Sequence, residues 1–255
     1  MEGLKDKVIV FAGAGGIATA TARYLGQGGA KVVVGDVLLA SAELTVRTCG
    51  DAGGEGVAAV ADISDEEQVK NLIELALSRY GRIDGLFNVA ANLSPEEVAR
   101  DTTVVDIELG AWQRNLAVNL TGYLLTCKHA IPRIIEAGGG GVVNTISAAV
   151  YGGMATNVAY QATKAGVGAL TRHIARTYGK QRVRANSVSP GLVLTEQLKG
   201  FLPADVRDQV LQTTPSFRHG EPADIGAMAA FLLSDLGEWV TGQAICVDGG
   251  TTMRP

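Results

Sequence analysis

Short apolar runs alternate along this chain with longer segments in which apolar residues recur at helical spacing. Continuously apolar strands are typical of a parallel sheet that is covered on both faces. Because parallel neighbours need a crossover connection, the helical segments fit between them. We expect an α/β fold, a doubly wound parallel sheet with helices on both faces and right-handed crossovers. The expected strands are 7–12, 31–36, 56–61, 83–90, 141–147, 182–188 and 243–248, and the expected helices are 16–28, 39–50, 65–79, 110–136, 158–179 and 222–235.

The length of 255 residues predicts a single domain spanning 1–255. Ser64 followed by three acids, and Pro222 before an apolar pattern, are helix-start signals. Two segments, 91–109 and 192–220, interrupt the alternation after the fourth and sixth expected strands. Long excursions at the carboxyl ends of strands usually carry function. We expect the second to be a substrate lid that is mobile without cofactor.

The net charge of −4, with acids and bases mixed along the chain, argues against nucleic acid and membrane as partners. Three cysteines lie far apart, without metal-ligand spacing, and predict buried free thiols in a reducing compartment. No apolar run approaches the roughly 20 residues that cross a bilayer, and no signal peptide is visible. We expect a cytoplasmic enzyme or binding protein that holds no metal.

Residues 13–18, GAGGIA, follow an expected strand and open an expected helix. This G-x-G-x-x-A pattern is typical of a dinucleotide-binding turn in a Rossmann-type sheet. Glycine permits the tight turn and a close approach of the backbone to a pyrophosphate, and the helix N-terminus supplies N–H donors and a positive dipole. The small Ala18 lets the helix pack near the strand. The candidate phosphate contacts are Gly13, Gly15, Gly16 and Ile17.

Three polar residues at strand ends are further cofactor candidates. Asp36, twenty residues after Gly16, can accept hydrogen bonds from the adenine ribose hydroxyls and would repel a 2′-phosphate. Since no Arg or Lys follows at 37 or 38, NAD is expected rather than NADP. Asp62 predicts either a contact with the adenine amino group or a helix-cap or turn role. Asn88 is expected to face the same crevice, with a turn-stabilising role as the alternative.

Tyr160 and Lys164 lie four residues apart on a helical pattern, so they share one face. Ser147, thirteen residues before Tyr160, ends an expected strand. A nearby ammonium and an oxidised nicotinamide would both lower the phenol pKa from its usual value near 10. Tyr160 could then take a proton from an alcohol as hydride leaves, or return it to a ketone. Ser147 would hold the substrate oxygen, and Lys164 would also bind the nicotinamide ribose.

Tyr and Lys at this spacing also occur on ordinary amphipathic helices. The matched Ser147 and the upstream glycine turn favour the catalytic interpretation. Together with further ordered motifs, they make the chain similar to the short-chain dehydrogenases/reductases of about 250 residues, over nearly its whole length. The motifs are the glycine turn, Asp36, Asp62-Ile63, Asn88 to Ala91, Asn119 within VNLTG, Ser147, Tyr160 with Lys164, Ser189-Pro190-Gly191 through Thr195, and VDGG at 247–250.

This resemblance implies a catalytic tetrad of Asn119, Ser147, Tyr160 and Lys164. Asn119 would bind a water that links Lys164 to bulk solvent as a proton relay. The implied cofactor contacts, besides the glycine turn, Tyr160 and Lys164, are Asp36, Asp62, Ile63, Asn88, Ala90, Pro190, Gly191, Val193 and Thr195. The resemblance also implies a homotetramer, or a homodimer, that acts on a small-molecule substrate.

The glycine turn departs from the family pattern. Ala12 replaces the usual threonine, the turn is one residue short, and Ala18 replaces the last glycine. Ala91 stands where the family has glycine, and makes that backbone less permissive. We therefore expect NAD to bind with an altered register and weaker affinity.

The pocket wall is expected from 150–157, 92–109 and 192–220, where no basic cluster indicates a phosphorylated or polycarboxylate substrate. The apolar candidates, for which plain core packing is the alternative, are Val150, Tyr151, Met154, Leu192, Phe201, Leu202 and Phe217. We expect an apolar secondary alcohol or its ketone, with cyclic and steroid alcohols as candidates.

Two other functions remain open. A carrier-linked 3-oxoacyl reductase commonly uses NADP and needs a basic docking patch, so Asp36 and the acidic balance weigh against it. A non-catalytic NAD(H)-binding sensor needs none of Ser147, Tyr160 and Lys164.

Overall fold

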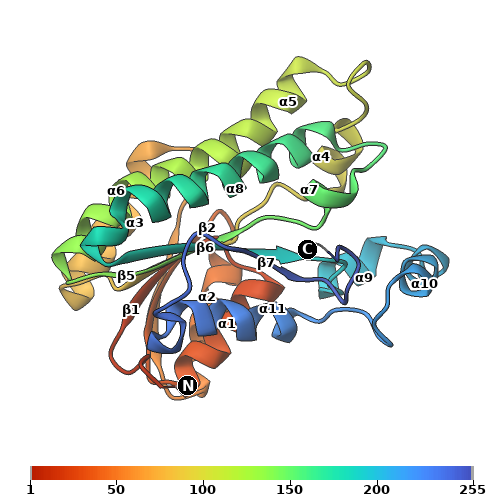
Figure 1. Cartoon of the computed structure of the whole chain (residues 1–255). Helices are drawn as coiled ribbons and strands as arrows, with labels where there is room; N and C mark the ends of the chain where they lie inside the picture. Colours follow the sequence, from red (N-terminus) through yellow and green to blue (C-terminus); the bar gives the residue numbers. More distant parts are fainter. Residues whose placement is uncertain (1, 254–255) are drawn as a thin grey trace.

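A computed structural model of the chain describes residues 2–253. Seven strands form one parallel sheet in the order β3-β2-β1-β4-β5-β6-β7 (Figure 1). The first three strands therefore run in order from β1 to one edge of the sheet. The chain then crosses to the other side of β1, where β4 to β7 follow in order to the opposite edge. This is the doubly wound sheet that the sequence predicts. The strands are β1 (Val8–Ala12), β2 (Lys31–Asp36), β3 (Glu55–Val60), β4 (Gly85–Asn88), β5 (Gly140–Thr145), β6 (Val183–Pro190) and β7 (Ala244–Val247).

Helices cover both faces of the sheet, as Figure 1 shows. One face carries α1 (Gly16–Gln27), α2 (Leu39–Asp51) and α11 (Pro222–Leu233). The opposite face carries α3 (Glu66–Tyr80), α6 (Gly122–Glu136) and α8 (Val158–Tyr178). Strand β1 is continuously apolar because both of its faces are buried: Ile9 and Phe11 pack into the core under α1 and α11, whereas Val8 and Val10 pack into the core under α3 and α6.

Local sequence signals set several helix ends. Asp65 precedes α3, and its side chain accepts hydrogen bonds from the backbone N–H groups of Glu67 and Gln68. Gly81 ends the same helix in the left-handed conformation, with φ of 75°. Pro222 occupies the first turn of α11. The two predicted helix starts are thus confirmed.

The segment expected as one helix over 110–136 is divided in the structure. It consists of α5 (Leu109–Leu116), a π-helical turn η1 (Ala117–Thr121) and α6. Asn119 lies in this turn and is fully buried. A π-helical turn widens the backbone by one residue and is frequent at functional sites. The apolar pattern alone could not reveal this widening, because the pattern continues through it.

Both expected excursions contain short helices. Segment 91–109 holds α4 (Pro95–Arg100), and segment 192–220 holds α9 (Glu196–Phe201) and α10 (Ala204–Thr213). None of these three helices has a buried residue. In Figure 1, α9 and α10 project to one side of the sheet, beyond α11. Two 3-10 turns, Gly179–Gln181 and Asp235–Gly237, and the short α7 (Ala149–Gly152) complete the fold.

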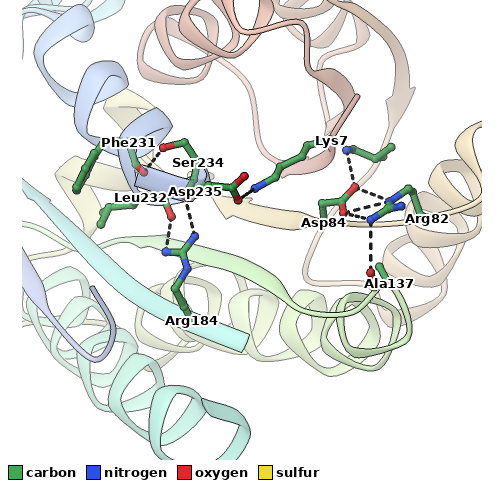
Figure 2. A network of polar contacts seen from close by, with 10 residues as sticks. Lys7, Arg82, Asp84, Ala137, Arg184, Phe231, Leu232, Ser234 and Asp235 are labelled. Carbon is green, nitrogen blue, oxygen red and sulfur yellow. Dashed lines mark hydrogen bonds and ion pairs between the residues drawn. The ribbon is translucent and has the colours of Figure 1, made fainter. Parts of the chain in front are cut away.

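Charged side chains at the amino ends of the strands form ion pairs and hydrogen bonds (Figure 2). Asp84, just before β4, accepts hydrogen bonds from the Arg82 guanidinium at 2.6–3.1 Å and from the backbone N–H of Val8 at 3.0 Å. Arg184 on β6 donates to the carbonyls of Leu232 at 2.7 Å and Ser234 at 3.1 Å. The Asp84 contact joins the starts of β1 and β4, and the Arg184 contacts join the start of β6 to the end of α11.

No helix within residues 2–253 is long and apolar enough to cross a membrane. In the same part of the chain, no three metal-ligating side chains gather into a metal site.

Candidate active site

The candidate residues gather at the carboxyl ends of the parallel strands. The sheet register aligns Ala12 with Gly35 and Asn88, and Asn88 with Asn144. The loops that follow these strands consequently leave the sheet on the same side. They line a cleft at the point where the chain order reverses between β1 and β4, which is where α/β sheets bind ligands. The lining residues are Gly13, Ala14, Asp36, Val37, Ala61, Asp62, Ile63, Ala90, Ala91, Asn92, Arg114 and Val118.

The glycine turn is built for close backbone contact. Gly13 has φ of 107°, and a side chain there would place its Cβ 2.5 Å from the backbone nitrogen of Ala90. Gly15 also has φ of 107°, but a Cβ there would meet no atom within 4 Å. No acceptor within residues 2–253 bonds the backbone N–H groups of Gly16, Ile17 and Ala18 at the start of α1. Open space beside free N–H donors at a helix N-terminus fits the diphosphate of a dinucleotide.

Asp36 holds this turn to the end of β2. One carboxylate oxygen accepts the backbone N–H of Ala14 at 2.7 Å, and the other accepts that of Leu38 at 2.8 Å. The Gly13 N–H also donates to the Gly35 carbonyl at 2.8 Å. These bonds fix the turn although Ala12 lacks the hydroxyl usual in the family. A carboxylate has about four acceptor positions, so Asp36 can still accept hydrogen bonds from ribose hydroxyls.

Asp62 has a turn role in the structure. One carboxylate oxygen accepts from the Ser64 backbone N–H at 2.9 Å and hydroxyl at 2.6 Å, while Asp65 caps the following helix. The other oxygen lies 3.7 Å from the guanidinium of Arg114. Both Asp62 and Arg114 line the cleft, so the turn role leaves an adenine contact available. No local pattern indicated Arg114 in advance.

Asn88 lies at the end of β4, but the expectation that its side chain faces the crevice is wrong. The residue is fully buried. Its amide nitrogen donates to Asn144 at 2.8 Å, and its amide oxygen accepts from the Thr126 hydroxyl at 2.7 Å. The side chain thereby links β4 to β5 and α6. A buried amide needs such partners, and they come from elements that lie far away in the sequence.

Helix α8 brings Tyr160 and Lys164 together, as their spacing predicts. The Lys164 amine is buried and donates to the Thr145 carbonyl at 2.9 Å and to the Tyr123 hydroxyl at 3.3 Å. It lies 5.8 Å from the centre of the Tyr160 ring. Burial lowers the pKa of Lys164 to about 7, and no carboxylate of residues 2–253 compensates its charge. At neutral pH this amine is poised between its two protonation states.

The sequence predicts a lowered pKa for Tyr160, but in this structure the pKa is raised. Burial is the larger cause, and a hydrogen bond with the Ser147 side chain opposes it. Two positive charges were expected to lower it. The first, Lys164, is itself only partly protonated near neutral pH, and the second belongs to an oxidised cofactor. Ser147 also accepts a hydrogen bond from the backbone N–H of Ala149 at 3.2 Å, which orients its hydroxyl.

Asn119 is held by protein groups. Its side-chain oxygen accepts the backbone N–H of Asn92 at 3.0 Å, and its amide nitrogen donates to Asn115 at 3.0 Å. Its side chain makes no hydrogen bond to Lys164. Tyr123, one turn further along the helix, reaches Lys164 instead and donates to the Ala90 carbonyl at 2.9 Å. Its spacing of four residues from Asn119 was the signal that could have found it.

The end of β6 leads back to the glycine turn. A side chain at Gly191 would place its Cβ 2.9 Å from the backbone of Asp248, so this segment lies against the VDGG motif. Thr195 caps α9 by accepting the backbone N–H of Leu198 at 3.1 Å. A Cβ on Gly16 would lie 3.1 Å from the Thr195 methyl group. The start of segment 192–220 therefore sits directly beside the glycine turn.

The expected pocket residues are not equally well placed. Phe217 is 91% exposed, so it contributes little to any pocket wall in this structure. Met154 and Phe201 are about half exposed, at 49% and 43%, and remain accessible to a ligand. Tyr151 is partly buried and packs against the core cluster that contains Ile146 and Val167.

Comparison with known proteins places this site in a family. A family model described as enoyl-(acyl carrier protein) reductase matches residues 12–252. The chain belongs to the short-chain dehydrogenase/reductase family. It is therefore an oxidoreductase, and the resemblance found in its motifs is confirmed.

Several relatives match over nearly their whole lengths. The cis-4-hydroxycyclohexanecarboxylate dehydrogenase of Sinomonas cyclohexanicum is 37% identical over 252 residues, covering 98% of both chains. The cyclohexanol dehydrogenase of an Acinetobacter strain is 35% identical over 250 residues, covering 98% of this chain and 96% of its own. A crystal structure of levodione reductase superposes with a TM-score of 0.88 at 32% identity, covering 96% of each chain. Short-chain dehydrogenases/reductases generally use a nicotinamide dinucleotide, and the cleft described above fits one.

Proposed function

We propose that the protein interconverts a secondary alcohol and a ketone by hydride transfer with NAD(H), and that Tyr160 is the general acid/base. The observation that carries the proposal is the grouping of Tyr160 with Ser147 and the buried amine of Lys164 at the carboxyl ends of β5 and β6. The nicotinamide, when bound, accepts the hydride from the alcohol or donates it to the ketone. Ser147 hydrogen-bonds the substrate oxygen, and Tyr160 takes or returns its proton.

Lys164 sets the proton affinity of Tyr160. When protonated, the amine favours the phenolate, because opposite charges attract strongly in a buried site. Its bond to the Thr145 carbonyl holds it at the end of β5, within reach of the ring. We assign to Asn119 the relay role that the family implies, with Asn92 and Asn115 fixing its side chain.

The proposed cofactor is NAD rather than NADP. Asp36 lines the cleft with a carboxylate that ribose hydroxyls can reach and that a 2′-phosphate would approach at an electrostatic cost. We propose diphosphate contacts from Gly13, Gly15, Gly16 and Ile17. The remaining proposed contacts are Asp62, Ile63, Ala90, Pro190, Gly191, Val193 and Thr195, together with the backbone of Asn88.

The proposed substrate is an apolar cyclic secondary alcohol or its ketone. Two of the relatives are dehydrogenases of cyclohexane derivatives, and this supports a ring-shaped substrate. Met154 and Phe201 are exposed apolar side chains in the segments expected to form the pocket. The carrier-linked 3-oxoacyl reductase is the second candidate because of the family-model description, and Asp36 weighs against it. A sensor without catalysis would not need the buried, uncompensated Lys164.

Three further properties complete the proposal. We propose that the chain is one domain in which segment 192–220 is a lid, since α9 and α10 have no buried residue and Thr195 lies beside the glycine turn. We also propose a homotetramer, or a homodimer, as the resemblance implies. A cytoplasmic location is supported by the buried free thiols of Cys49 and Cys127.

The test is NADH production from NAD over a panel of cyclohexanols, substituted cyclohexanols and steroid alcohols, with NADP as the comparison. Wild type, Tyr160→Phe and Tyr178→Phe are measured together. Tyr178 lies at the other end of α8 and serves as the matched control. We expect turnover with NAD in the wild type and the control, and a loss of about 10²- to 10⁴-fold in Tyr160→Phe. Equal activity in the two variants would overturn the role of Tyr160.

A further inference from the structure

Helix α8, which carries Tyr160 and Lys164, has no local N-terminal cap. The preceding residue, Asn157, has φ of 63° and ψ of 43°, and its side chain bonds the Thr156 hydroxyl rather than the helix. The first intrahelical bond runs from the N–H of Gln161 to the Asn157 carbonyl. The backbone N–H groups of residues 157–160 must therefore find acceptors elsewhere.

Two neighbouring residues of segment 91–109 supply all four acceptors. The Asp101 carbonyl accepts from Asn157 at 2.8 Å, and the Thr102 carbonyl accepts from Val158 at 3.4 Å. The Asp101 carboxylate accepts from Ala159 at 2.9 Å through one oxygen and from Tyr160 at 2.8 Å through the other. A residue 59 positions earlier in the chain thus bonds the backbone of Tyr160 itself.

Both oxygens of the Asp101 carboxylate accept hydrogen bonds from the first turn of α8. The residue is only 2% exposed, and no ion pair to it is found within residues 2–253. The neighbouring Arg100 pairs with Glu97 and Glu108 instead. A buried carboxylate is costly unless its oxygens are hydrogen-bonded, and the positive end of a helix dipole favours its charge. The first turn of α8 supplies both the donors and the dipole.

We infer that Asp101 is a positioning residue for Tyr160. Its two bonds hold the first turn of α8 against segment 91–109, so the Tyr160 ring keeps its place beside Ser147. Lys164 lies one turn further along and has its own anchor at the Thr145 carbonyl. Loss of the Asp101 carboxylate would therefore move Tyr160 more than Lys164. The catalytic consequence rests on the function proposed above, whereas the structural one does not.

The test compares Asp101→Ala and Asp101→Asn with Asp65→Ala. Asp65 is a matched control, because its carboxylate also accepts two backbone N–H groups at a helix start, on α3 away from Tyr160. Amide hydrogen exchange is measured on peptides covering 157–163 and 65–70, without substrate. We expect faster exchange in the first turn of α8 for Asp101→Ala only, and in the first turn of α3 for Asp65→Ala only.

The second readout is kcat and the KM for NAD. Misplacing a catalytic group by about 1 Å can cost roughly 10²-fold in rate, so we expect kcat of Asp101→Ala to fall by about 10- to 100-fold. The KM for NAD should change less than about twofold, because Asp101 does not line the cofactor cleft. Asp101→Asn retains one acceptor oxygen and should fall between wild type and Asp101→Ala. If Asp101→Ala does not fold, the exchange and kcat of Asp101→Asn decide whether Asp101 positions Tyr160.

Unchanged exchange over 157–163 in the Asp101 variants would overturn the inference. So would a kcat in Asp101→Ala equal to that in Asp65→Ala. If the wild type turns over no alcohol of the panel, the proposed function falls, and the exchange comparison still decides whether Asp101 holds the turn that carries Tyr160.

Discussion

The two ends of the sheet treat buried charge in opposite ways. At the amino ends of the strands, Asp84 is paired with Arg82, and Lys7 is paired with Asp235 (Figure 2). At the carboxyl ends, the amine of Lys164 is buried with only neutral partners, and the N–H groups that open α1 have no acceptor among the described residues. Paired groups contribute to stability, whereas uncompensated groups remain available to a ligand or a proton.

The pKa shifts of Arg82, Lys164 and Tyr160 follow the same division. Arg184, at the amino end of β6, is an exception, because burial lowers its pKa too, although an arginine stays charged. The Asp84 carboxylate raises the pKa of Arg82, so that arginine is held in its charged form. Burial lowers the pKa of Lys164 to about 7 and raises that of Tyr160. The groups at the carboxyl ends are thus the ones that can change protonation state when a charged ligand arrives.

The largest expected effect is on activity at the carboxyl end. Replacing Lys164 by Met removes the charge that favours the Tyr160 phenolate, and we expect kcat to fall by about 10²- to 10⁴-fold. Lys128→Met, which removes an exposed ion pair with Glu66, is the control and should retain its activity. Steady-state kinetics with NAD check this prediction. A loss of less than tenfold in Lys164→Met would argue against the proton-transfer role.

The next effect is on stability at the amino end. Asp84→Ala leaves the Val8 N–H and the Arg82 guanidinium without their carboxylate. Because Arg82 is half exposed, the loss is smaller than for a fully buried pair, and we expect unfolding to require about 2 kcal/mol less. Urea titration measures this change, with Glu74→Ala at an exposed pair as control. The kcat of the folded Asp84→Ala protein should equal that of wild type. A tenfold loss of kcat would contradict the assignment of the amino-end charges to stability alone.

A smaller effect is expected on cofactor choice. Asp36→Asn removes the negative charge and keeps an oxygen that can accept the Ala14 N–H. We expect the ratio of kcat/KM for NAD to that for NADP to fall by about tenfold, equivalent to about 1.4 kcal/mol. An unchanged ratio would mean that another group rejects the 2′-phosphate.

The smallest effect concerns Tyr123. Tyr123→Phe removes the hydroxyl that accepts from Lys164 and donates to the Ala90 carbonyl. A net loss of about 1 kcal/mol predicts a fall in kcat of about fivefold. The same measurement on Tyr178→Phe is the control. Equal kcat values in the two variants would show that Lys164 needs no support from Tyr123.

The sequence predicted the fold well because its signals are local. Each strand was visible as a short run rich in apolar residues. The glycine turn, Asp36 and the Tyr160–Lys164 pair lie at fixed spacings in the sequence. Parallel pairing then brings all the strand ends to one edge. Knowledge of element order was therefore enough to gather Ser147, Tyr160 and Asp36 on the same side of the sheet.

The features that the sequence analysis predicted wrongly or missed depend on contacts between residues that are distant in the sequence. The Asn88 side chain turns inward because Thr126 and Asn144 are there to bond it. The cap that Asp101 provides for α8 crosses almost 60 residues and leaves no local pattern. The pKa of Tyr160 is raised because burial outweighs its hydrogen bond with Ser147, and burial is known only from the assembled fold.

The decisive measurement is the pH dependence of the stability difference between wild type and Lys164→Met, without ligands. The unfolded lysine keeps its proton up to about pH 10.5, and the folded one releases it near pH 7. Between these values the unfolded wild type binds the extra proton, so its stability relative to the variant should rise with pH, by up to about 1.4 kcal/mol per unit. Urea titrations at pH 7.5, 8.5 and 9.5 test this. A rising difference would establish an uncompensated buried amine beside Tyr160, whereas a constant or falling difference would contradict it.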